Sequence, residues 1–159
     1  MSLTKTRDEV LELAYKDFAY LIAKGYKVVG VEVTGTSFWA VVFEGRCRIR
    51  VDWYFRDGLS IMLAKSGTAV DEYWKWSSIE TLVCFLINEE AVRQFYDILR
   101  RTKATDRIQE CSSFLSNNLD VASEFVAGDN FEKSDFQLMQ VRKVLDDIHT
   151  ERATRNKLK

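Results

Sequence analysis

Three arginines alternate with apolar residues near the middle of the chain. Arg46, Arg48 and Arg50 are separated by Cys47 and Ile49, so on a β-strand they would share one face at intervals of about 6.6–7 Å. Guanidinium groups beside aromatic and apolar side chains are enriched at protein interfaces and on single-strand nucleic-acid platforms. The spacing therefore predicts a recognition surface. The alternative is a solvated sheet face on which the arginines form ion pairs with Glu32, Glu44 or Asp52.

A second candidate is the aromatic segment 72–77, which precedes a predicted helix. Large amphipathic rings at the junction of two elements anchor protein partners, or else they close the end of a hydrophobic core. The sequence leaves both interpretations open. The predicted partner-binding set combines the rings of this segment with the arginines and with Tyr54, which follows the arginine-bearing strand. The set is Arg46, Arg48, Arg50, Tyr54, Tyr73, Trp74 and Trp76.

Catalytic and metal-binding patterns are missing from the sequence. The chain has one histidine, His149, whereas a zinc site usually needs about four clustered Cys or His ligands. Cys47, Cys84 and Cys111 have no ligand spacing and fall on apolar periodicities, which predicts buried, unreactive thiols. The sequence contains no glycine-rich phosphate-binding motif. We therefore predict a noncatalytic protein without metal or cofactor, with His149 solvated near a helix end.

Composition and charge exclude several classes. At 159 residues, with 47% hydrophobic and 30% charged residues, the chain suits one globular domain and not a disordered, collagen-like or disulfide-rich protein. Its net charge of −1 lacks the basic excess of a dedicated nucleic-acid binder. Residues 71–97 hold six acidic against two basic side chains, a local charge of −4. Widely spaced cysteines, an odd number of them, fit a reducing cytoplasm. We expect neither a signal peptide nor a membrane span.

The elements that must position these residues begin with a helix. Thr6 and Glu9 form a capping box, and Gly25 is placed to end the helix. From residue 27 the hydrophobic period changes from 3.6 to 2, which predicts a four-stranded antiparallel meander over residues 27–65. The apolar stripe of the helix comprises Leu11, Tyr15, Phe18 and Ile22.

The turn before the arginine strand leaves its register open. If Glu44 and Gly45 form a two-residue turn, Arg50 pairs with Trp39. A three-residue loop pairs Arg50 with Phe38 instead, and the other arginines shift in step.

The following hairpin is predicted to have a three-residue loop that ends at Gly58 in the left-handed conformation. This register pairs Trp53 with Ile61 and Val51 with Leu63 on one face of the sheet.

The second half of the chain is predicted to be helical. Capping signals at residues 77–80, 88, 105 and 134 begin about four helices, and the last two carry stripes suited to an antiparallel pair over the sheet. We predict one α+β domain over residues 1–150, with the helices packed mainly on one sheet face, and a frayed basic tail over residues 151–159. The predicted core comprises Leu11, Phe18, Val31, Ile49, Val51, Ile61, Leu86, Phe95, Leu115, Leu119 and Leu145.

The layout resembles a group of small bacterial proteins, some of which are similar to immunity proteins of polymorphic toxin systems. The resemblance lies in the stretches 48–58 (RIRVDWYFRDG), 72–79 (EYWKWSSI) and 114–119 (FLSNNL), with a late final helix. It implies a stoichiometric cytoplasmic binder that blocks the active site of a toxin, and the acidic stretch 71–97 is compatible with a basic nuclease as that toxin.

Three functions follow from the sequence, in order of preference. The first is a noncatalytic cytoplasmic protein-binding module, for which the resemblance implies an immunity-type role. The second is a nucleic-acid-associated accessory protein that uses the arginine face. The third is a small-ligand-binding or hydrolytic enzyme centred near Tyr54, Asp57, Tyr73 and Trp74. We expect binding to depend on the arginine strand and the aromatic segment, not on His149, and leave the partner and the oligomeric state open.

Overall fold

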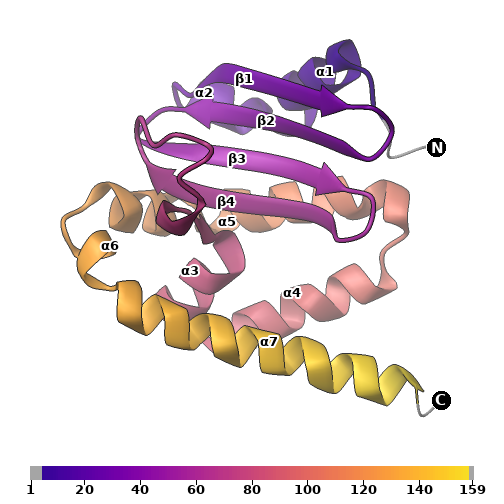
Figure 1. Cartoon of the computed structure of the whole chain (residues 1–159), viewed down its shortest axis with the longest axis vertical. Helices are drawn as coiled ribbons and strands as arrows, with labels where there is room; N and C mark the ends of the chain where they lie inside the picture. The colour runs from indigo at the N-terminus through magenta and orange to yellow at the C-terminus, as the bar shows by residue number, and fades with distance from the viewer. Residues whose placement is uncertain (1–4, 158–159) are drawn as a thin grey trace.

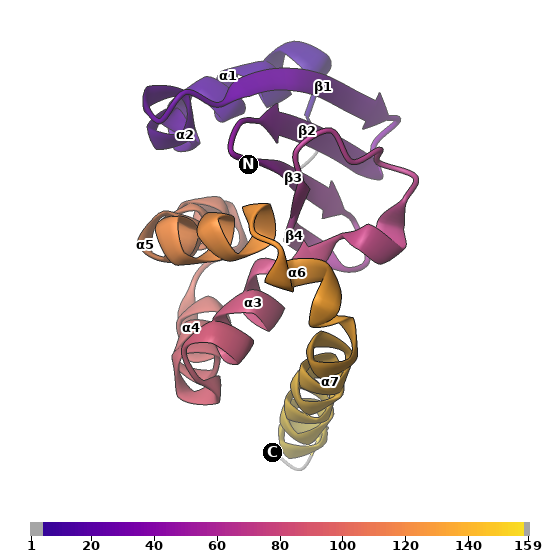
Figure 2. The same ribbon diagram turned by 90° about the vertical axis from the view of Figure 1, so that its left-hand side faces the viewer.

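The computed structural model describes residues 5–157, without the side chains of residues 152, 153 and 155–157. It confirms the predicted α+β class, with five strands in place of four. In Figure 1, α1, α2 and α5 lie behind the sheet, and the segment between β4 and β5 crosses in front of it. Figure 2 shows α3, α4 and α7 below the sheet.

The N-terminal helix begins at the predicted capping box. α1 (Arg7–Asp17) is followed by the short α2 (Ala19–Ala23), and Thr6 and Glu9 exchange hydrogen bonds between side chain and backbone. The predicted stripe was wrong in part, since Tyr15 is 56% exposed and Leu11 is only half-buried. The buried face keeps Phe18 of the predicted stripe but otherwise lies about one residue earlier in the chain. Its buried members are Val10, Leu13, Ala14, Phe18 and Leu21.

The sheet is antiparallel throughout, in the order β1-β2-β3-β4-β5. The four long strands are β1 (Lys27–Thr34), β2 (Phe38–Glu44), β3 (Cys47–Tyr54) and β4 (Gly58–Lys65). The fifth, β5 (Ser77–Ser78), has two residues, which pair with Leu63 and Met62. The fifth strand arises because Ser77 and Ser78, which we expected to begin a helix, pair with the edge of the sheet before α3 begins.

Both predicted registers for the arginine strand were wrong. Arg50 pairs with Val42 and Arg48 pairs with Glu44. The connection between the two strands consists of Gly45 and Arg46, and the backbone N–H of Gly45 donates to the carbonyl oxygen of Cys47 at 3.0 Å. The arginine at position 46 is thereby left in the turn, outside β3, and does not share the strand face with the other two.

The β3–β4 hairpin keeps its predicted faces but not its predicted pairs. Gly58 has the expected positive φ, 83°. However, Val51 pairs with Ile61 and Trp53 pairs with Leu59, because the loop consists of residues 55–57 and Gly58 already belongs to β4. Since side chains alternate along a strand, this two-residue slip leaves every side chain on the face predicted for it.

The second half is helical, as predicted. Its helices are α3 (Ile79–Leu86), α4 (Glu89–Arg101), α5 (Arg107–Ala127), the single-turn α6 (Asn130–Lys133) and α7 (Asp135–Lys157). α5 packs on β3 and β4, whereas α7 packs on α3, so the expected antiparallel pair over the sheet is wrong for α7. α7 runs through most of the segment that we expected to fray. Residues 158–159 lie outside the described residues.

The core lies between the inner sheet face and the helices. Eight of the eleven predicted core residues are buried, among them Ile49, Val51 and Leu115. Leu11, Val31 and Leu86 are half-buried, which corrects their placement. No helix within the described residues is long and apolar enough to cross a membrane.

Candidate functional site

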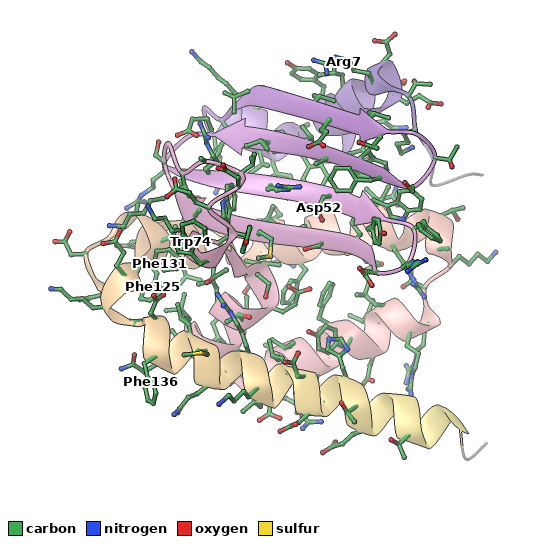
Figure 3. The ribbon with its side chains drawn as sticks, viewed as in Figure 1. Arg7, Asp52, Trp74, Phe125, Phe131 and Phe136 are labelled. Carbon is green, nitrogen blue, oxygen red and sulfur yellow. The ribbon has the colours of Figure 1, made fainter. Side chains whose placement is uncertain are left out.

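The segment that joins β4 to β5 exposes two large rings. We call residues 66–76 the aromatic loop. Tyr73 is 75% exposed and Trp74 is 61% exposed, and both lie in a single 3₁₀ turn, η1 (Tyr73–Lys75). Their ring centroids are 5.5 Å apart with the planes at 82°, an edge-to-face contact. Figure 3 shows Trp74 at the surface beside the sheet. Each ring is therefore available to a partner.

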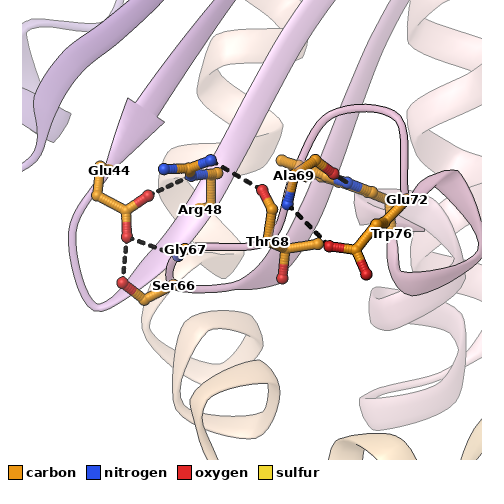
Figure 4. A network of polar contacts seen from close by, with 8 residues as sticks. All are labelled: Glu44, Arg48, Ser66, Gly67, Thr68, Ala69, Glu72 and Trp76. Carbon is orange, nitrogen blue, oxygen red and sulfur yellow. Dashed lines mark hydrogen bonds and ion pairs between the residues drawn. The ribbon is translucent and has the colours of Figure 1, made fainter.

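Trp76 anchors the aromatic loop from within. It is 3% exposed, and its Nε1 donates to the carbonyl oxygen of Ala69 at 3.0 Å. The carboxylate of Glu72 accepts from the N–H of Ala69 at 3.3 Å, as Figure 4 shows. Of the three predicted rings, Trp76 alone is buried. Tyr73 and Trp74 stay exposed.

Arg48 connects the arginine strand to the aromatic loop. Its Nε pairs with the carboxylate of Glu44, and its Nη1 donates to the carbonyl oxygen of Thr68 at 2.8 Å. The same carboxylate of Glu44 accepts from the Ser66 hydroxyl and from the N–H of Gly67 (Figure 4). The structure thus joins the two regions that the sequence singled out, but it makes Arg48 a positioning residue for the loop.

The ionised form of Glu44 is the stable one in this network. Burial alone would raise the pKa of Glu44, but the hydrogen bonds from Ser66, Arg48 and Gly67 outweigh burial and hold that pKa below its ordinary value. A carboxyl group whose pKa is lowered in the folded state stabilises the fold above its unfolded pKa. That contribution is lost as the pH falls through the folded pKa.

Glu44→Gln should therefore destabilise the protein in a pH-dependent way. At pH 7 we expect the free energy of unfolding to fall by about 1–2 kcal/mol, because charge-assisted hydrogen bonds become neutral ones. Urea titrations between pH 7 and pH 3 should show the two proteins converging below pH ~4, near the ordinary pKa of a glutamate. Glu12→Gln, on an exposed position of α1, is the control. A difference that stays constant with pH would contradict the role given to the carboxylate.

Arg50 is also engaged within the chain. Its Nε donates to the carboxylate of Asp52 at 2.9 Å, both side chains are about one-fifth exposed, and its guanidinium lies 5.8 Å from the ring centroid of Phe38. Burial raises the pKa of Asp52, and Arg50 offsets part of that effect. Asp52 lies on the sheet face that points toward the viewer in Figure 3. These are the ion pairs that the alternative interpretation of the arginines expects.

The remaining predicted residues lie apart from the aromatic loop. Arg46 is exposed in the β2–β3 turn. Tyr54 ends β3, with its ring centroid 5.4 Å from that of Phe55. Tyr54 and Asp57 lie at the β3–β4 turn, before the start of β4, whereas the aromatic loop begins after the end of β4. The four residues of the predicted enzyme site thus come from two separate connections of the sheet.

Two hollows flank the aromatic loop. On one side, a cavity of about 180 Å³ is lined by Trp74, Phe131 and Asp135, among others. On the other side, a cleft of about 420 Å³ is lined by Tyr73, Trp76 and residues of β4, α3, α4 and α7. His149 is exposed and lies in this second cleft, with its ring centroid 4.6 Å from that of Tyr96. His149 thus lies in the cleft beside the aromatic loop, whereas we expected it to lie apart from the binding residues.

The cysteines have the environment of structural thiols. Cys47 and Cys111 are buried, as predicted, and burial raises their pKa values to about 11 and about 12. Cys84 is half-buried, which corrects the prediction of full burial, and burial raises its pKa as well. Thiols with raised pKa values are protonated and weakly nucleophilic near neutral pH. Within residues 5–157, no three metal-ligating side chains are clustered.

The sequence missed several residues around the loop. Glu80, Tyr96, Arg142 and Asp146 line the larger cleft but come from three helices, and no sequence spacing connects them. Only the fold brings them beside Tyr73. Comparisons of the chain with protein-family models, with curated proteins and with solved structures found no match.

Proposed function

We propose that the protein is a noncatalytic cytoplasmic binding module that recognises another protein through Tyr73 and Trp74, and that it serves as an immunity-type inhibitor of a toxin. The observation that carries the proposal is a pair of large exposed rings on a loop that is braced at its base. Tyrosine and tryptophan are the residue types that most often dominate binding energy at protein interfaces. A braced loop loses little conformational entropy on binding, which favours affinity.

The charges around the aromatic loop favour a basic partner. Asp71 and Asp135 have no ion pair among the described residues. Both lysines nearby are paired, Lys75 with Glu72 at 2.5 Å and Lys65 with Glu132 at 3.8 Å. The loop and the smaller cavity therefore present an excess of negative charge. Complementary potentials speed association and suppress wrong partners, so a toxin with a basic active-site face, such as a nuclease, suits this surface.

A nucleic-acid-associated role is the second candidate. The observation in its favour is the mixed surface at the far end of the sheet, where Arg50 lies over Phe38 and Arg56 lies 5.3 Å from the ring centroid of Phe55. Single-strand binders combine such rings with a basic track for the phosphates. Arg48 and Arg50 are already paired with Glu44 and Asp52, which makes them poor phosphate ligands. The protein partner is for this reason the preferred function.

Site-specific photo-crosslinking tests the proposal. A photoreactive amino acid at position 74 should capture one protein in native cells. The same group at position 15, an exposed tyrosine on α1 behind the sheet, should not capture it. The captured protein should then bind the purified chain at equal stoichiometry.

A labelled single-stranded oligonucleotide, titrated at low and moderate salt, provides the opposing test. Tight binding that weakens steeply with salt and is lost in Arg48→Glu with Arg50→Glu would favour the nucleic-acid role, because released counterions supply that affinity. Equal capture from positions 74 and 15 would also contradict the proposed surface.

A further inference from the structure

The larger cleft beside Tyr73 combines a fixed shape with converging charges. Its volume of about 420 Å³ lies within the range of sites that hold a small ligand, about 300–1,000 Å³. Its walls come from β4, the first turn of α3, α4 and α7. Four separate elements therefore hold the cleft open, and it does not depend on one mobile segment.

The cleft carries an excess of negative charge. Two carboxylates, Glu80 and Asp146, line it against one guanidinium, that of Arg142. Arg142 is committed to the protein, because its Nη2 donates to the carbonyl oxygen of Trp76 and to the hydroxyl of Ser77, each at 3.1 Å. Together with Glu80, Asp146 and Arg142, an occupant with one positive charge would bring the net charge of the cleft to zero.

Glu80 gains the most from such an occupant. Burial raises the pKa of Glu80, and hydrogen bonds from its own N–H and from Ser78 offset only part of that effect. Burial thus disfavours the charged form of Glu80, and a cation placed beside it in the cleft would stabilise that form.

Aromatic rings provide the remaining wall. Tyr73 and Tyr96 both line the cleft, and the ring of His149 packs against Tyr96. The face of an aromatic ring attracts an ammonium or guanidinium group within about 6 Å of its centroid. Carboxylates and tyrosine rings in one cleft form a site for an organic cation with an apolar stem, which describes a lysine or arginine side chain.

We infer that this cleft receives a lysine or arginine side chain of the protein partner while Tyr73 and Trp74 cover the surface around it. The inference rests on the proposed function, since it names the chemistry of the same partner. It also agrees with the acidic surroundings of the aromatic loop.

The test uses the intact chain and small probes of that side chain. Nα-acetyl-arginine amide and Nα-acetyl-lysine amide should shift the backbone NMR signals of residues that line the cleft, in a saturable titration. Nα-acetyl-citrulline amide, a neutral isostere of the arginine probe, should bind at least about tenfold more weakly, because it lacks the charge. Glu80→Gln and Asp146→Asn should each weaken the arginine probe by about tenfold. Asp147→Asn, an exposed neighbour outside the cleft, should leave its affinity unchanged.

Three results would overturn the inference. They are equal affinity for the citrulline and arginine probes, unchanged affinity in both folded carboxylate variants, and tighter binding of Nα-acetyl-glutamate amide. Because Asp146 is exposed, Asp146→Asn tests the contribution of the cleft's negative charge even where Glu80→Gln does not fold. The probe assay contains no partner protein, so its failure leaves the crosslinking result at position 74 standing. Failed crosslinking with successful probe binding would contradict the proposed function alone.

Discussion

Val51→Asp is expected to prevent the protein from folding in soluble form. Val51 is completely buried on the inner face of β3, where it pairs with Val41 on one side and with Ile61 on the other. An unpaired charge at such a position costs several kcal/mol, against a total stability of about 5–15 kcal/mol for a typical domain. The measurement is the soluble fraction after expression, followed by circular dichroism and thermal unfolding of any soluble protein.

Val29→Asp is the matched control for this substitution. Val29 is 52% exposed and lies at the irregularity in β1, where the pairing with β2 shifts between Val28 and Gly30. The same chemical change there should alter stability by no more than about 0.5 kcal/mol. A soluble Val51→Asp protein with a cooperative transition would show that the inner face of β3 is assigned wrongly.

The faces of the strands could be predicted from the sequence because alternation is a local property. In β3, Ile49 and Val51 point inward because every second residue is apolar, and this holds for any register that keeps the alternation. The register itself depends on turn geometry. The turn after Glu44 could not be assigned because the sequence is compatible with both two- and three-residue connections. In the structure, Arg48 pairs with Glu44.

The role of Arg48 was hidden for the same reason. Its partner Glu44 lies four residues away in the sequence, but its contact with Thr68 crosses twenty residues and requires the aromatic loop to fold back onto the sheet. The sequence left open whether Tyr73 and Trp74 are buried or exposed. The size of the rings and their position before a helix do not distinguish a ring that packs in the core from one that contacts a partner. Only the packing of Trp76 shows which ring of the three turned inward.

The cleft could not be predicted from the sequence at all. Glu80 reads as an ordinary acidic residue in the first turn of a helix, a position that the helix dipole favours. His149 reads as a solvated residue near the end of another helix. The packing of α7 on α3 places them together, and that packing departs from the antiparallel pair over the sheet that the apolar stripes suggested.

Removing the two exposed rings should abolish partner binding without unfolding the protein. For each of Tyr73→Ala and Trp74→Ala, we expect the affinity for the protein crosslinked at position 74 to fall at least about 30-fold. This corresponds to the ~2 kcal/mol or more that a central aromatic residue contributes to an interface. The free energy of unfolding should change by less than about 1 kcal/mol, because both rings are largely exposed. Calorimetric titration and urea unfolding measure the two effects.

Three alanine variants show how far the interface extends. Tyr15→Ala removes a ring that is 56% exposed on α1 and should change neither affinity nor stability. Arg50→Ala and Tyr54→Ala probe the open sheet face, and each should reduce affinity by less than about threefold, since Arg50 is held by Asp52 and the ring of Tyr54 packs against Phe55 at the β3–β4 turn. If both ring variants kept full affinity and Arg50→Ala lost most of it, the interface would lie on the sheet instead, centred on Arg50 and Phe38.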